Sequence, residues 1–144
     1  MRTGIKIVLT GLILLTGCVT LKEGNGLLKK GEYFEASLKF KDALELDSTS
    51  PVIHNNLGVA YRLRKLYALA ENELLKAIKF GPYYYKAYNN LGNVYYDRKN
   101  YIQAIEYYNK AIELKGDYDE AYWNLALTYE AIADTINAVR AWRR

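Results

Sequence analysis

Large side chains recur at helical spacing through most of this chain, and the same pattern appears again at fixed intervals. Three positions spaced by three to four residues occur in two separate segments: Leu57, Tyr61 and Arg64, then Leu91, Tyr95 and Arg98. Such spacing places side chains on one face of an α-helix. The pattern therefore predicts amphipathic helices that pack through a shared face.

Turn-forming residues divide the pattern into eight expected helices. The turns are predicted at Gly31, 47–51, 81–82 and 115–117, which are rich in Gly, Pro, Asp and Ser. Pro51 is suited to the first position of a helix. The expected helices are 20–30, 33–46, 51–64, 67–80, 85–98, 101–114, 119–132 and 135–144.

The repeat has a period of 34 residues. The hexapeptide that begins at Asn56 returns at Asn90 and Asn124, and alanines 70, 104 and 138 keep the same interval. A fixed period of this length is typical of stacked helix pairs, in which each unit buries its apolar face against its neighbours. A bundle without repeats would not require the same residue types every 34 positions.

These residues resemble the tetratricopeptide repeat (TPR) family. The residues that carry the resemblance are Leu57, Leu91 and Leu125; Gly58, Gly92 and Ala126; Tyr61, Tyr95 and Tyr129; and Ala70, Ala104 and Ala138. The resemblance implies an all-α, right-handed superhelical TPR solenoid of about four helix pairs. The expected divisions are a signal peptide at 1–17, a degenerate first repeat at 18–50, repeats at 51–84 and 85–118, and a C-terminal repeat at 119–144.

The first and last repeats depart from the pattern. The first has Glu23 in place of the repeated leucine, and Gly24 and Gly26 each cost about 1 kcal/mol relative to alanine within a helix. In the last, the chain stops inside the expected final helix, at residues 141–144, without the polar capping helix that such arrays usually carry. Trp142 occupies the position that usually packs against a following repeat. We therefore expect a weak first helix and an apolar C-terminal edge, through which two copies could form a homodimer.

The N-terminus resembles a bacterial lipoprotein signal. Arg2 and Lys6 precede a short apolar run over residues 7–16, and the run ends in Leu15-Thr16-Gly17-Cys18. This resembles a lipobox and implies cleavage before Cys18 and lipidation of that cysteine. The alternatives are an ordinary secretory signal with an incidental cysteine and an uncleaved anchor. Lipidation implies a location in the bacterial cell envelope, at the outer membrane if the host is Gram-negative.

Charge and composition argue against nucleic acid and catalysis. Removal of the signal takes away Arg2 and Lys6 and no acidic residue, so the formal net charge falls from +4 to +2. This weak, unclustered charge gives no reason to expect nucleic-acid binding. The single histidine, His54, aligns with tyrosines in the other repeats and is expected to be a packed ring. No cofactor, metal site or catalytic set is expected, and we interpret the chain as no enzyme.

The inner groove is the expected binding site. In the family, the first helix of each unit lines the concave face through one stripe of side chains. Here the candidate groove residues are Asn55, Val59, Arg62, Lys86, Asn89, Asn93, Tyr96, Trp123 and Leu127, and the same stripe includes Val52, Glu120 and Glu130. Asparagine amides both donate and accept, which suits the backbone of an extended peptide.

One TPR subfamily holds peptide carboxyl termini with a clamp of lysine, asparagine and arginine side chains. Asn25, Asn56 and Lys86 match three clamp positions, but Leu21 and Asn90 stand where the family has cations. We therefore expect no such clamp. The resulting hypothesis is a membrane-anchored scaffold of the cell envelope that binds a peptide or protein partner in its groove. The alternatives are a lipoprotein that binds a small molecule or delivers a substrate in the same groove, and a truncated member with little activity.

Overall fold

The computed structural model of the protein describes residues 2–143, with side chains from residue 16 onward. The described chain is entirely α-helical apart from its turns. The helices are α1 (Arg2–Lys30), α2 (Tyr33–Leu46), α3 (Pro51–Leu63), α4 (Tyr67–Phe80), α5 (Tyr85–Asp97), α6 (Tyr101–Leu114), α7 (Asp119–Ala131) and α8 (Thr135–Trp142). The all-α fold of four helix pairs that the sequence predicts is confirmed.

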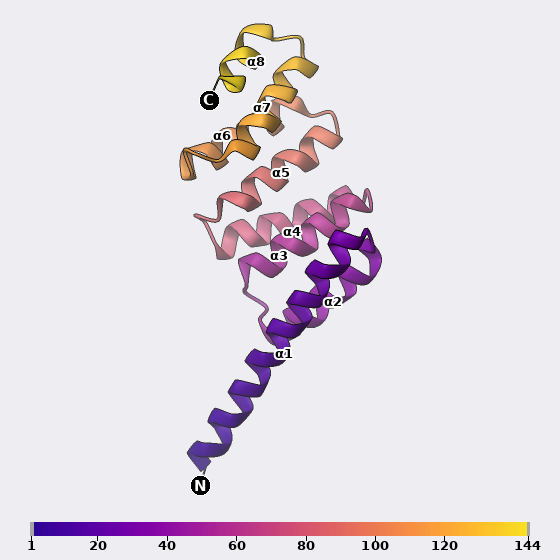
Figure 1. Ribbon diagram of the computed structural model, residues 1–144, viewed down its shortest axis with the longest axis vertical. Coiled ribbons are helices and arrows are strands. Elements are labelled where there is room, and N and C mark those ends of the chain that lie inside the picture. The colour runs from indigo at the N-terminus through magenta and orange to yellow at the C-terminus, as the bar shows by residue number, and fades with distance from the viewer. Residues whose placement is uncertain (1, 144) are drawn as a thin grey trace.

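The helices form a curved stack of pairs. Helices α1 and α2, α3 and α4, α5 and α6, and α7 and α8 pack most extensively, and each pair contacts the next (Figure 1). The odd-numbered helices also contact one another in succession, whereas in the described chain the even-numbered helices do not. The odd-numbered helices therefore form the inner, concave layer, and the even-numbered helices form the outer layer.

A left-handed residue ends the first helix of every pair. Gly31, Lys65, Lys99 and Ala133 have φ of 82°, 60°, 61° and 58° and are spaced 34 residues apart. A residue in this conformation commonly terminates a helix. The same turn in all four pairs gives each unit the same geometry, which is the basis of a regular solenoid.

Glycine in the inner helix allows close approach of the outer helix. A Cβ added to Gly92 would lie 2.6 Å from Cε1 of Tyr108, and one added to Gly58 would lie 2.7 Å from Cγ of Leu74. Both large side chains are fully buried. The small residue and the large one therefore fit together as one packing unit inside each pair.

The first helix differs from its expected bounds. It begins at Arg2 rather than near residue 20, and it passes through Gly24 and Gly26 without interruption. A Cβ at Gly24 would lie 2.5 Å from Cε1 of the buried Phe40, so this glycine is needed for the contact between α1 and α2. The expected weakness of this helix rests on the local cost of glycine, and the contact of Gly24 with Phe40 is a stabilising feature that the sequence did not show. The weakness itself stays a prediction.

The N-terminal part of α1 projects from the stack as a single helix (Figure 1). Over the residues that the structure describes, no helix has both the length and the hydrophobicity needed to cross a bilayer. The last helix ends at Trp142, two residues before its expected end, and residue 144 lies outside the described chain. The division into signal peptide and repeats stays a prediction.

Candidate functional site

The concave layer brings part of the expected groove together. A cavity of about 350 Å³ lies among α3, α5 and α7. It is lined by Arg62, Asn93, Tyr96, Asp97, Tyr108, Glu120, Asn124 and Leu127. Four of these, Arg62, Asn93, Tyr96 and Leu127, are among the predicted site residues, and Glu120 belongs to the predicted stripe.

Three residues of this cavity are not among those predicted from the sequence. Tyr108 comes from the outer helix α6, Asp97 follows Tyr96 at the end of α5, and Asn124 is one position beyond the predicted stripe on α7. The recurrence of asparagine at 56, 90 and 124 was the available signal for Asn124. The sequence held no such signal for Tyr108, because a large residue at this position of the repeat is expected to be part of the hydrophobic core.

Two predicted groove residues are buried and do not face solvent. Asn55 is 4% exposed and Asn89 is 0% exposed. Asn90 Nδ2 donates to Asn55 Oδ1 at 2.8 Å, and Asn124 Nδ2 donates to Asn89 Oδ1 at 3.0 Å. The expectation that these two amides present themselves to a peptide is therefore wrong for this structure, because each joins its helix to the next inner helix.

The polar side chains of the cavity are held in fixed orientations. Arg62 Nη1 donates to Asp97 Oδ2 at 3.0 Å, and this ion pair connects α3 with the end of α5. The Tyr108 hydroxyl donates to Asn93 Oδ1 at 2.7 Å. Burial raises the pKa of Tyr108, so its hydroxyl stays protonated and keeps donating across the neutral range.

The other predicted residues do not line this cavity. Val59 is half-buried, Lys86 is exposed, and Trp123 is 56% exposed. Trp123 and Trp142 meet edge to face, with ring centroids 4.4 Å apart, and Trp142 Nε1 donates to Glu130 Oε1 at 2.9 Å. Trp142 is thus engaged with α7 rather than standing free at the end of the stack.

Cys18 is exposed on α1 and lies beside a second cavity at the other end of the concave layer. This cavity, of about 380 Å³, is lined by Cys18, Leu21, Lys22, Asn25, Gly26 and Lys29. Asn56 Nδ2 donates to Asn25 Oδ1 at 2.8 Å, which connects α3 to α1.

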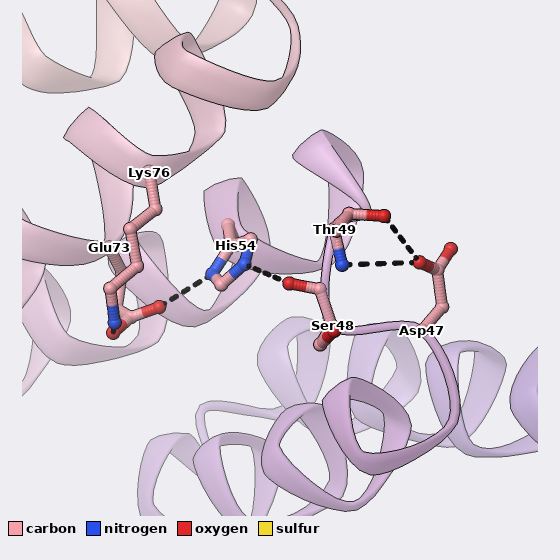
Figure 2. A network of polar contacts seen from close by, with 6 residues as sticks. All are labelled: Asp47, Ser48, Thr49, His54, Glu73 and Lys76. Atoms are coloured by element: carbon pink, nitrogen blue, oxygen red, sulfur yellow. Dashed lines mark hydrogen bonds and ion pairs between the residues drawn. The ribbon is translucent and has the colours of Figure 1, made fainter.

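His54 belongs to a buried network outside the groove (Figure 2). Its Nδ1 lies 2.7 Å from Glu73 Oε2 and its Nε2 lies 3.0 Å from the carbonyl oxygen of Ser48. In the next repeat, the Tyr88 hydroxyl donates to the carbonyl of Pro82, which is the corresponding position. Both ring nitrogens are occupied, which agrees with the expected packed ring.

Among the residues that the structure describes, no group of three or more His, Cys, Asp or Glu side chains is arranged to hold a metal ion.

Comparison with known proteins agrees with this architecture. The family model described as "Tetratricopeptide repeat" matches residues 85–118, and the model described as "TPR repeat" matches residues 24–63. No curated protein matches the sequence.

Several solved structures are similar. The crystal structure of MamA has 30% identity and a TM-score of 0.78, with 88% of this chain and 74% of that chain covered. The first TPR of Spaghetti (RPAP3), bound to the HSP90 peptide SRMEEVD, has 28% identity and a TM-score of 0.76, with 83% and 94% covered. Pseudomonas aeruginosa PilF, at 23% identity and a TM-score of 0.83, covers 91% of this chain and 60% of that chain, and shows likeness of fold alone.

The repeat spacing, the glycine packing, the family models and the likeness to MamA agree: the chain belongs to the tetratricopeptide repeat family.

Proposed function

We propose that this protein is a membrane-anchored interaction scaffold of the bacterial cell envelope that binds an extended peptide segment of a partner in its concave groove. The observation that carries the proposal is the cavity among α3, α5 and α7, in which Arg62, Asn93 and Asn124 place donors and acceptors along one side of the stack. The proposal gives the chain a binding role and no catalytic one.

The lining favours a peptide over a small molecule. Pockets for small molecules are mostly apolar, with few polar groups. Here Leu127 is the one aliphatic residue among the eight that line the cavity, and the rest carry polar groups. Such a surface suits a peptide backbone, which presents an N–H and a C=O at each residue. A small-molecule or substrate-delivery lipoprotein is therefore the second candidate.

A similar structure supports the peptide-binding proposal. The first TPR of Spaghetti (RPAP3) is bound to a peptide, and its chain is covered over 94% of its length. Because the two chains are only 28% identical, the comparison supports peptide binding as a general mode and does not support binding of that particular peptide.

The anchor is a further part of the proposal. Cys18 follows the apolar segment and is exposed on α1, where it is accessible for modification. Two acyl chains attach a protein stably, whereas one gives marginal binding. Lipidation at Cys18 would place the α1 end of the groove beside the membrane, at the outer membrane if the host is Gram-negative.

Association of two copies through the α7–α8 end also stays a prediction. Ile136 and Val139 are exposed there, although Trp142 packs against Trp123. Sedimentation of the full-length protein in detergent at several concentrations tests it, and a monomer at all concentrations would contradict it.

Selection from a random peptide library tests the proposed function. The full-length protein in detergent is immobilised, and enriched peptides are measured by fluorescence anisotropy. We expect Tyr96→Ala to weaken binding at least fivefold, because aromatic side chains supply much of the contact energy in interfaces. Ile102→Ala, on the exposed outer face of α6, is the matched control and should bind normally. Equal binding by both variants would show that the groove is not the site.

A further inference from the structure

The cavity among α3, α5 and α7 carries more negative than positive charge. Its charged lining residues are Arg62, Asp97 and Glu120. Arg62 is already paired with Asp97 at 3.0 Å, so this pair is neutral as a unit. Glu120 forms no ion pair with any residue that the structure describes. One carboxylate therefore faces the cavity without a counter-charge.

Neutral donors hold the Glu120 carboxylate in place. Asn89 Nδ2 donates to its Oε1 at 3.0 Å, and the Tyr118 hydroxyl donates to its Oε2 at 2.9 Å. Burial, and next the Glu120 carboxylate itself, raise the pKa of Tyr118, so the hydroxyl keeps its proton and goes on donating. Each carboxylate oxygen has room for a further hydrogen bond. The group is thus oriented in advance but not neutralised.

Two aromatic rings and a second carboxylate stand on α5 and α7. Tyr96 lines the cavity, and Trp123 stands one turn after Glu120 on α7 and is largely exposed. Glu130, farther along α7, accepts only from the Trp142 indole among the described contacts. Aromatic faces attract cations, and Arg and Lys also pair with carboxylates. The aromatic rings and the carboxylates therefore both favour a lysine or arginine side chain.

We infer that the cavity among α3, α5 and α7 takes a lysine or arginine side chain of the bound peptide, with the cationic group at the Glu120 carboxylate and the stem against Tyr96. This inference rests on the proposed peptide-binding function and names the chemistry of its partner. A side chain of this kind has an apolar stem and a charged end, which matches a cavity with a ring on its wall and a carboxylate at its edge.

The similar structure holds a peptide with more acidic than basic residues. The peptide bound by Spaghetti (RPAP3), SRMEEVD, contains two glutamates and a terminal aspartate. In this chain, Asn90 donates its amide to Asn55, and Leu21 carries no charge, so neither supplies a cation. An acidic segment at the α7 end would meet the uncompensated Glu120. Charge of one sign in a site selects against partners of the same sign.

The measurement must report binding at this cavity alone, because the charge of the groove differs between its two ends. Lys22 and Lys29 line the cavity at the α1 end and could attract an acidic peptide there. Nuclear magnetic resonance of the ¹⁵N-labelled full-length protein in detergent separates the two ends. The reporters are the indole N–H of Trp123 and the side-chain amide of Asn124, which stand on α7.

Three capped tripeptides serve as probes: acetyl-Gly-Arg-Gly-amide, the citrulline analogue, which has the same shape without the charge, and the glutamate analogue. We expect the arginine peptide to shift both reporters with saturation at millimolar concentration, and the citrulline peptide to bind about tenfold more weakly. Glu120→Gln should weaken the arginine peptide about tenfold, since it removes the charge and keeps an acceptor for Asn89. Glu113→Gln, on the exposed face of α6, is the matched control and should change nothing.

The inference is overturned if the arginine peptide shifts neither reporter, if citrulline or glutamate binds as well as arginine, or if Glu120→Gln has no effect. These outcomes differ from failure of the proposed function. Library peptides that bind the groove through Tyr96 but carry acidic side chains at α7 would refute the inference and leave the function standing. If the proposed function is wrong, the library peptides will bind equally well to the protein with and without Tyr96→Ala.

Discussion

Asn124 donates its amide to the Oδ1 of Asn89 at 3.0 Å, and this bond joins α7 to α5. The same bond, from Asn90 to Asn55 at 2.8 Å, joins α5 to α3 one repeat earlier. The acceptor residues are buried and the donor residues are half-buried, so these bonds lie between neighbouring helices. A pair of asparagines thus fixes the spacing of successive inner helices.

Asn89→Ala is expected to destabilise the fold. The substitution leaves the amide of Asn124 without its acceptor and removes the donor to Glu120. The two lost side-chain hydrogen bonds, one of them to a carboxylate, are together worth about 1–3 kcal/mol, so the free energy of unfolding should fall by about that amount. Urea unfolding followed by circular dichroism measures it. Asn109→Ala, on the exposed face of α6, is the control, and an equal effect of both substitutions would contradict the prediction.

Gly92→Ala is expected to disrupt the pair α5–α6. The new Cβ would lie 2.6 Å from the ring of Tyr108, which is fully buried and cannot move freely. Overpacking of this kind costs about 1–3 kcal/mol. Gly116→Ala is the matched control, because nothing lies within 4 Å of its added Cβ. Thermal unfolding of the two variants should show a lower midpoint for Gly92→Ala alone.

Lys99→Gly should stabilise the protein slightly. Lys99 has a φ of 61°, which is unfavourable for a residue with a side chain and acceptable for glycine. The gain is reduced by the greater freedom of glycine in the unfolded chain, so we expect at most about 1 kcal/mol. Lys110→Gly within α6 should instead destabilise by about 1 kcal/mol. The midpoints of urea unfolding of both variants, compared with that of the unchanged protein, measure this. A lower midpoint for Lys99→Gly would contradict the expectation.

Stability should decline in alkaline solution. Burial raises the pKa values of Tyr84, Tyr95, Tyr107, Tyr108 and Tyr118 above that of free tyrosine. Above about pH 10 these groups lose protons in the unfolded chain first, so the folded state binds more protons and stability falls as pH rises. Below that pH the contribution is fully present.

Ultraviolet absorbance near 295 nm follows tyrosine ionisation directly. The buried tyrosines should titrate only as the helical circular dichroism signal is lost. Complete ionisation at pH 10 with the helices intact would refute this prediction.

The proposed lipid anchor predicts a specific defect in Cys18→Ser. The variant should remain uncleaved at residue 17 and should take up no radiolabelled palmitate, because it has no thiol to acylate. Membrane fractionation of the producing cells, with labelling of the unchanged protein as the control, measures this. Normal labelling of Cys18→Ser would show that the cysteine is not the attachment point.

The 34-residue period in the sequence was enough to predict the helices, their pairing and the turns between them. This worked because each unit is defined by nearby residues, such as Gly92 and the large side chain sixteen positions later, which recur in register. For the first helix, the sequence shows the local cost of Gly24 but not its contact with Phe40 on α2.

The sequence also placed the candidate site on the inner helices, and four of its predicted residues, Arg62, Asn93, Tyr96 and Leu127, line one cavity. It could not decide which asparagines face solvent. Asn89 and Asn90 are adjacent and lie about 100° apart around the axis of α5, so the orientation of the helix decides which of them faces its neighbours. That orientation is set by how α5 packs between α3 and α7, which only the tertiary structure determines, and the same packing places Tyr108 and Asp97 beside residues distant in the chain.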